Sequence, residues 1–202
     1  MITGSMTYSS QVPDIHNVLK ISIPGFLWSL KRLKKNIESS ESLLFSWGNF
    51  VRAIVLNEYN QIALLKVIRN DDEFGPGNYY ETPGGGKEEN ESFIEGVIRE
   101  VEEEIGYTSS FIQEIGIVED YYNAIYRKNI NHYYLLKVKG KSQQHFESYG
   151  DLFIKDVIWV SIDEAISLYE KMNKDKIEKL VRNRELPILK IVKEILGGKE
   201  NG

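Results

Sequence analysis

Residues Gly85–Tyr107, with the sequence GGKEENESFIEGVIREVEEEIGY, join a run of glycines to a strongly acidic helix pattern. Ser92 with Glu95 three residues later is the pattern of a capping box, and Gly106 is a typical helix stop. Between them, apolar residues recur at the spacing of one helical face, namely Ile94, Val97, Ile98, Val101 and Ile105. The stretch therefore predicts a helix from Ser92 to about Ile105 that buries this face in a core.

Three glutamates of this helix share a neighbouring face, at positions i, i+3 and i+4: Glu100, Glu103 and Glu104. Like charges at this spacing repel by about 0.2–0.5 kcal/mol per pair, and these crowd the helix end where the dipole is negative. A solvated acidic face is the ordinary interpretation of a glutamate-rich helix, but selection for stability alone would avoid this arrangement. Convergent carboxylates are the ligands that Mg²⁺ prefers, so the pattern indicates a divalent cation site.

The spacing of the residues in this stretch resembles the box of the Nudix hydrolase family. That box reads G-x5-E-x7-R-E-U-x-E-E-x-G-U, where U is an apolar residue. Its fixed positions are filled here by Gly85, Glu91, Arg99, Glu100, Glu103, Glu104 and Gly106, with Tyr107 at the last apolar position. Pro83 and Gly84 precede the box as they do in the family. The resemblance covers about residues 46–172 and does not cover the first 45.

The resemblance implies hydrolysis of a diphosphate linkage in a nucleoside diphosphate joined to another group, with Mg²⁺ or Mn²⁺ as cofactor. By motif position, the metal ligands would be Glu100, Glu103, Glu104 and the Gly85 carbonyl, and Glu100 is the candidate base. Gly84 and Gly86 would let the backbone approach the phosphates. Arg99 and Glu91 would pair with each other in a supporting role. A further acidic residue from a distal loop would be Glu147 first, then Asp151.

Aromatic residues near the box are candidates for contact with a nucleobase, above all Tyr80 and Tyr122. Nucleoside triphosphates, including modified ones, are the default substrate that the resemblance implies. Dinucleoside polyphosphates, ADP-ribose and nucleotide sugars are alternatives; the lack of any proline between Pro83 and Pro187 counts mildly against ADP-ribose. A non-catalytic Nudix fold that serves as a ligand sensor or partner-binding module is the alternative of another class. The intact pairs of box glutamates argue against it.

Composition narrows the class of protein further. The 202 residues are 42% apolar and 27% charged and include no cysteine, which excludes disulfides, cysteine nucleophiles and zinc–thiolate sites. With a net charge of −5, the chain lacks the overall excess of basic residues that is typical of a DNA-binding protein. We therefore expect a nucleotide-type small molecule as the partner and no DNA. No targeting segment or membrane span is evident, so the cytoplasm is the expected location.

The segments around the box predict a mixed α/β domain. Strands are expected at 50–57 and 61–68, joined as a hairpin, and then at 111–122, 130–139 and 153–160, with a loop at 69–80. A helix is expected at about 163–172, and the last helical stretch, 175–196, contains Pro187, which should break or kink it. The resemblance adds the fold class α/β, as a Nudix-type α/β/α sandwich around a mixed β-sheet with an N-terminal helical extension and a C-terminal helix.

The chain divides into three parts on this interpretation. They are an N-terminal extension over 1–45, of which 1–5 read like a tag scar, a Nudix hydrolase domain over 46–172 and a C-terminal helical region over 173–202. Apolar stripes in both end regions need burial: Phe26, Leu30 and Leu33 near the start, and Leu186, Leu189, Val192 and Leu196 near the end. The main domain or a second copy of the chain, in a homodimer, are the candidates to cover them.

Overall fold

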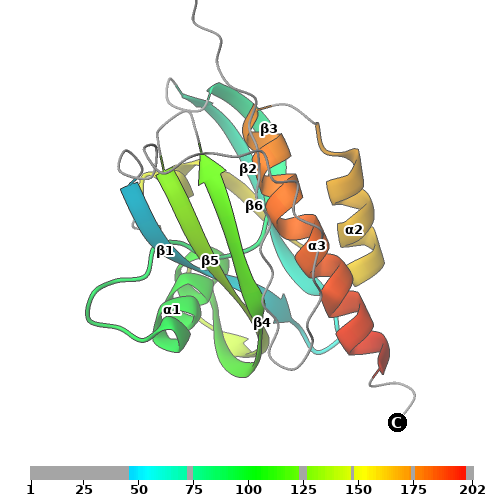
Figure 1. Cartoon of the computed structure of the whole chain (residues 1–202). Helices are drawn as coiled ribbons and strands as arrows, with labels where there is room; N and C mark the ends of the chain where they lie inside the picture. The colour runs from blue at the N-terminus through cyan, green and yellow to red at the C-terminus, as the bar shows by residue number, and fades with distance from the viewer. Residues whose placement is uncertain (1–45, 72–74, 123–126, 147, 174–175, 199–202) are drawn as a thin grey trace, which may run out of the picture.

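The computed structural model describes residues 46–71, 75–122, 127–146, 148–173 and 176–198, and Figure 1 shows their arrangement. The predicted N-terminal extension lies outside these residues. In chain order the elements are β1 (Ser46–Leu56), β2 (Ile62–Asp71), β3 (Gly75–Glu81), α1 (Phe93–Ile105), β4 (Tyr107–Tyr122), β5 (Arg127–Lys141), the short 3₁₀ helix η2 (Gly150–Phe153), β6 (Ile154–Val160), α2 (Ile162–Lys171) and α3 (Lys176–Gly198).

The strands form one mixed sheet, as predicted. Their order is β3-β2-β1-β5-β4, and β6 pairs with β2 outside this path. β1 and β5 run parallel, whereas β2 is antiparallel to β1, β3 and β6, and β4 is antiparallel to β5. The expected β1–β2 hairpin closes at Leu56, which lies opposite Ile62.

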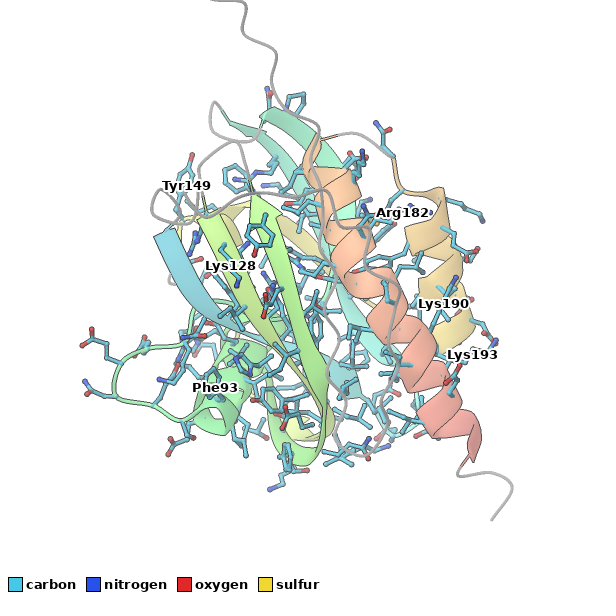
Figure 2. All side chains as sticks on the ribbon, viewed as in Figure 1. Phe93, Lys128, Tyr149, Arg182, Lys190 and Lys193 are labelled. Atoms are coloured by element: carbon cyan, nitrogen blue, oxygen red, sulfur yellow. The ribbon has the colours of Figure 1, made fainter. Side chains whose placement is uncertain are left out.

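Helices flank both faces of this sheet. Successive residues of β5 point to opposite faces, and two neighbours show which helix lies on each. The His132 ring lies 4.0 Å from the ring of Phe93, which begins α1 (Figure 2). The next residue, Tyr133, is fully buried on the other face. Burial, followed by the charge of Glu185 in α3, raises the pKa of the Tyr133 hydroxyl, so α3 lies on this other face. α2 and α3 lie side by side, apart from α1 (Figure 1). This arrangement confirms the sandwich.

Both ends of α1 are hydrogen-bonded outside the helix. At the start, the Ser92 hydroxyl accepts from the Glu95 amide and the Glu95 carboxylate accepts from the Ser92 amide, so the capping box is confirmed. Gly106 ends the helix in the left-handed conformation, with φ 69°. The segment after β5 then covers the last turn. The His145 amide donates to the Glu103 carbonyl, and the Gln144 side chain donates to the Glu104 carbonyl. The Ser142 amide donates to the Gly106 carbonyl.

One expectation about secondary structure is wrong, and a second is wrong in one of its two alternatives. Part of the predicted loop at 69–80 is the strand β3, whose Gly75–Glu81 pair with Asp71–Leu65 of β2. β3 lies at the end of the sheet order, and an edge strand tolerates the proline at position 76. Pro187 does not break its helix, because α3 is continuous from Lys176 to Gly198. An interior proline costs about 3 kcal/mol, but α3 also buries Ile188, Leu189 and Val192 completely, at about 1.5–3 kcal/mol each.

The C-terminal helix belongs to the same core as the sheet. Its apolar stripe, including Leu189 and Val192 of the sequence prediction, is buried within this chain, alongside Ile177, Leu180, Val181 and Ile188. Burial of this stripe therefore needs no second copy of the chain. No helix among the described residues is long and apolar enough to cross a membrane.

If α3 is an integral part of the core, Leu189→Ala will lower the free energy of unfolding by about 2–5 kcal/mol, because it leaves a cavity beneath the helix. Lys193→Ala is the control. Lys193 lies on the exposed side of α3 (Figure 2), where its ion pair with Asp163 is worth less than about 1 kcal/mol. Urea unfolding of both variants measures the difference. A loss below 1 kcal/mol for Leu189→Ala would show that α3 is an appendage.

Candidate functional site

The glycine turn, defined here as Pro83–Lys87, lies alongside β1. Three backbone hydrogen bonds hold it there: the amides of Ala53 and Val51 donate to the carbonyls of Pro83 and Gly85, at 2.8 and 3.0 Å, and the Lys87 amide donates to the Asn49 carbonyl, at 3.0 Å. The Gly85 carbonyl, predicted as a metal ligand, therefore already accepts one hydrogen bond. A carbonyl oxygen has two lone pairs, so one remains for a second partner.

Two positions of the glycine turn have no room for a side chain. Gly84 has φ 142°, and a Cβ there would lie 2.0 Å from the Val51 carbonyl oxygen. At Gly85 a Cβ would lie 2.6 Å from a carboxylate oxygen of Glu100. At Gly86 a Cβ would meet nothing within 4 Å. The turn is thus packed against β1 and α1 at its first two glycines and open at the third.

The three predicted metal-ligating glutamates of α1 are all buried. Glu100, Glu103 and Glu104 are 8%, 5% and 5% exposed. Two of them contact the glycine turn: the Gly84 amide donates to Glu104 Oε2 at 2.6 Å, and the Glu100 carboxylate lies beside Gly85. These carboxylates are therefore not a solvated face, and their role as metal ligands stays a prediction.

Burial makes the ionised form of two of these carboxylates unfavourable. Loss of hydration raises the pKa of Glu100 to about 7, although the neighbouring Arg99 charge opposes the shift. Burial, followed by repulsion from Glu100, raises the pKa of Glu104 well above its usual range, against the hydrogen bond from Gly84. Further positive charge beside these two groups would therefore favour their ionised form.

Arg99 supplies the positive charge at the centre of this cluster. Its guanidinium donates to both oxygens of Glu91, at 2.9 and 3.0 Å, as the predicted supporting pair. Its Nη1 also donates to Glu100 and to Glu103, at 2.9 Å each, and its Nη2 donates to the Gly86 carbonyl at 3.1 Å. Arg99 therefore links the helix to the glycine turn and lies between two of the predicted metal ligands.

The donor set fits a hard divalent cation. Carboxylate and carbonyl oxygens are the ligands of Mg²⁺ and Mn²⁺, and the space beside Glu100 exists only because position 85 is glycine. Within the described ranges, no three histidine or acidic side chains stand at the spacing of a ready-made cation site. Arg99 is the counter-charge that holds Glu100 and Glu103 in this arrangement.

The remaining predicted residues lie in three different settings. Tyr80 is in β3, half-buried against the core, two residues before Thr82. Tyr122 ends β4, and its side chain lies outside the description. Glu147 also lies outside the described residues. Asp151 is buried, and its carboxylate accepts from the Ser148 amide and hydroxyl, which orders the start of η2.

The sequence interpretation missed a second buried polar group next to the turn. Arg52 of β1 donates to the Gly84 carbonyl at 2.8 Å and lies 3.8 Å from Glu81. Arg184 of α3 lies 3.7 Å from Glu81 and 3.8 Å from Asp120. Asp120 is 1% exposed and accepts hydrogen bonds from two asparagines of β5, Asn129 and Asn131.

One sequence signal could have located this second group. Arg184 and Glu185 fall on the apolar face of their helix, four residues after Leu180 and Val181 and four before Ile188 and Leu189. Charged residues at core positions of an amphipathic helix must find partners inside the protein. Both are buried in the structure, and Glu185 is fully so.

Comparisons with known proteins agree with this geometry. A family model described as "NUDIX domain" matches residues 49–182. The solution structure of the E. coli ORF135 protein is similar at TM-score 0.55 and 19% identity, over 76% of this chain and 94% of that chain. A NUDIX hydrolase from Nitrosomonas europaea has TM-score 0.55 and 19% identity over 76% and 91% of the two chains. A MutT protein from Methanosarcina mazei Go1 has TM-score 0.54 and 22% identity over 74% and 96%. No curated protein sequence matches the chain.

The packing of the turn predicts different tolerance at two neighbouring glycines. Gly84→Ala will lower the free energy of unfolding by at least about 2 kcal/mol, because its Cβ would overlap the β1 backbone and its φ disfavours a side chain. Gly86→Ala, whose Cβ enters open space, will change stability by less than about 0.5 kcal/mol. Thermal and urea unfolding of the two variants compare them, and equal losses would contradict the packing described for Gly84.

Proposed function

Because this chain belongs to the Nudix family and is a pyrophosphohydrolase that acts on phosphoric anhydrides, we propose that it hydrolyses the pyrophosphate linkage of a nucleoside diphosphate derivative, with Mg²⁺ or Mn²⁺ as its cofactor. A nucleoside monophosphate and a second phosphorylated product would be released. The single observation that carries the proposal is the joint burial of Glu100, Glu103 and Glu104 on α1, with Glu100 and Glu104 in contact with the glycine turn.

The box residues share two roles in this proposal. Glu100, Glu103, Glu104 and the Gly85 carbonyl would hold the cation, and Glu100 is also the candidate base that would orient and deprotonate the attacking water. The bound cation would supply Lewis-acid stabilisation of the charge that develops on the phosphoryl oxygens. Their burial supports this role, because oriented charges act more strongly where water is excluded.

The neighbouring residues position the reacting groups. Arg99 and Glu91 brace the carboxylates and the Gly86 carbonyl, as their hydrogen bonds indicate. We retain Gly84 and Gly86 as the candidate backbone surface for the phosphates, and the open space beside Gly86 supports the part of this assignment that concerns Gly86. We retain Tyr80 and Tyr122 as candidates for contact with the nucleobase and Glu147 as a candidate for a further acidic residue.

A nucleoside triphosphate, ordinary or modified, is the substrate class that we propose first. We expect Mg²⁺-dependent turnover of one member of a panel of nucleoside triphosphates, oxidised dGTP, diadenosine polyphosphates, ADP-ribose and nucleotide sugars, with a monophosphate among the products resolved by chromatography. Removal of the metal with EDTA should abolish turnover, and added Mg²⁺ should restore it. Turnover that persists in EDTA would contradict the metal assignment, and preference for another panel member would reassign the substrate.

Substitution of one ligand tests the site directly. Glu103→Gln keeps the size of a side chain that is 5% exposed but removes its charge, so we expect turnover to fall by at least about 10³-fold in a folded protein. Glu102→Gln is the matched control one residue away, on a half-exposed position that faces Ser142, and should retain wild-type turnover. Wild-type turnover in Glu103→Gln would remove this residue from the metal site.

A further inference from the structure

We propose that Glu185 of α3 is a positioning residue for this reaction: it holds Thr82, and through Thr82 the glycine turn, in the geometry that faces the carboxylates of α1. The inference rests on the function proposed above. Glu185 and its neighbour Arg184 lie outside the region that the family model matches, since that region ends at residue 182, whereas Thr82 lies inside it.

The Glu185 carboxylate is fixed by four hydrogen bonds in a fully buried position. Its Oε2 accepts from the Thr82 amide at 2.8 Å and from the Tyr169 hydroxyl at 2.6 Å. Its Oε1 accepts from Arg184, at 2.6 Å from Nη2 and 3.2 Å from Nε. A carboxylate that is 0% exposed and saturated with donors has no alternative partners in water, so its position is tightly constrained.

Thr82 is the point at which the strand becomes the turn. The pairing of β3 with β2 ends at Glu81, opposite Leu65. The next amide, that of Thr82, is bonded to α3 through Glu185, whereas Pro83 has no amide hydrogen to donate. The amide after that, of Gly84, is bonded to α1 through Glu104. The start of the glycine turn is therefore held between two helices from different faces of the sheet.

A second connection runs from α3 to the same turn through charges. Arg184 lies 3.7 Å from Glu81, and Glu81 lies 3.8 Å from Arg52. Arg52 in turn donates to the Gly84 carbonyl at 2.8 Å. The Gly84 carbonyl thus accepts from Arg52, which is connected to α3 through Glu81 and Arg184. The Gly84 amide donates to Glu104 on α1. A shift of α3 would move the turn relative to the carboxylates.

Two double variants isolate the acceptor oxygen of Glu185 from its charge. Arg184→Met combined with Glu185→Gln removes the ion pair but keeps an oxygen that can accept from Thr82. Arg184→Met combined with Glu185→Leu removes the ion pair and that oxygen, at similar volume. Replacing both members of the Arg184–Glu185 pair leaves neither charge of that pair alone. Asp120 keeps its hydrogen bonds from Asn129 and Asn131, and Glu81 keeps Arg52, so both proteins should fold. Tyr169→Phe is the further control, since it removes only the other hydrogen bond to Oε2.

The expected result separates positioning from a merely structural role. The leucine variant should have a kcat about 10–100-fold below that of the glutamine variant, a higher Mg²⁺ concentration for half-activation, and faster hydrogen exchange in the peptide covering residues 81–88. The two should melt within about 4 °C of each other. Tyr169→Phe should keep the wild-type kcat and exchange in this peptide. Equal kcat and equal exchange in the two double variants would overturn the proposal, as would a loss in Tyr169→Phe as large as that in the leucine variant.

A measurement on the wild-type chain decides the matter even if a variant fails to fold. The Thr82 amide should exchange as slowly as amides in the centre of β1, because its acceptor is buried in the core. Rapid exchange at Thr82 would overturn the inference. Since exchange needs neither metal nor substrate, slow exchange in a chain that hydrolyses none of the panel would refute the proposed function and leave the hydrogen bond from Thr82 to Glu185 standing.

Discussion

The structure depends on one electrostatic constraint: three glutamates on consecutive turns of α1 are buried together. Each buried charge costs several kcal/mol unless donors or counter-charges surround it. Arg99 meets this requirement for Glu100 and Glu103, and the Gly84 amide meets part of it for Glu104. Because the donor to Glu104 is a backbone amide, the glycine turn has to lie in direct contact with the helix and against β1, with no side chain in the way. The shape of the turn and the charge of the helix are therefore consequences of the same constraint.

The end of α1 shows how the chain accommodates this arrangement. Three glutamates near a helix C-terminus oppose the helix dipole, and the last turn carries no basic residue. The compensation comes from a distant segment, whose Ser142, Gln144 and His145 donate hydrogen bonds to the last carbonyls of the helix. The loop after β5 is thus part of what keeps the carboxylates in place, although its own side chains are mostly exposed. Helix and loop form one unit around the site.

A feature of this fold could be predicted from the sequence when the residues that determine it lie close together in the chain. The capping box, the stop at Gly106 and the face of three glutamates all arise within one helix, so local sequence patterns located them. β3 was missed because Gly75, Pro76 and Gly77 have low strand propensity and pair only through the edge position that the sheet provides. The buried position of Asp120 was not predicted because nothing near it in sequence reveals the asparagines of the neighbouring strand. The contact between Thr82 and Glu185 spans 103 residues, which no local pattern encodes.

Local and long-range features also differ in what they contribute to the candidate site. A carboxylate cluster on one helix sets which ion and which reaction the site can support, since its donors are fixed by i, i+3 and i+4 spacing. In the function proposed above, it would not set where the phosphates lie, because the glycine turn, which we propose as their binding surface, belongs to another part of the backbone. That second position is fixed where Thr82 meets Glu185 and where Gly84 meets Arg52. A helix at the far end of the chain, continuous through Pro187 and buried along its apolar face, is then as necessary to the active geometry as the acidic helix itself.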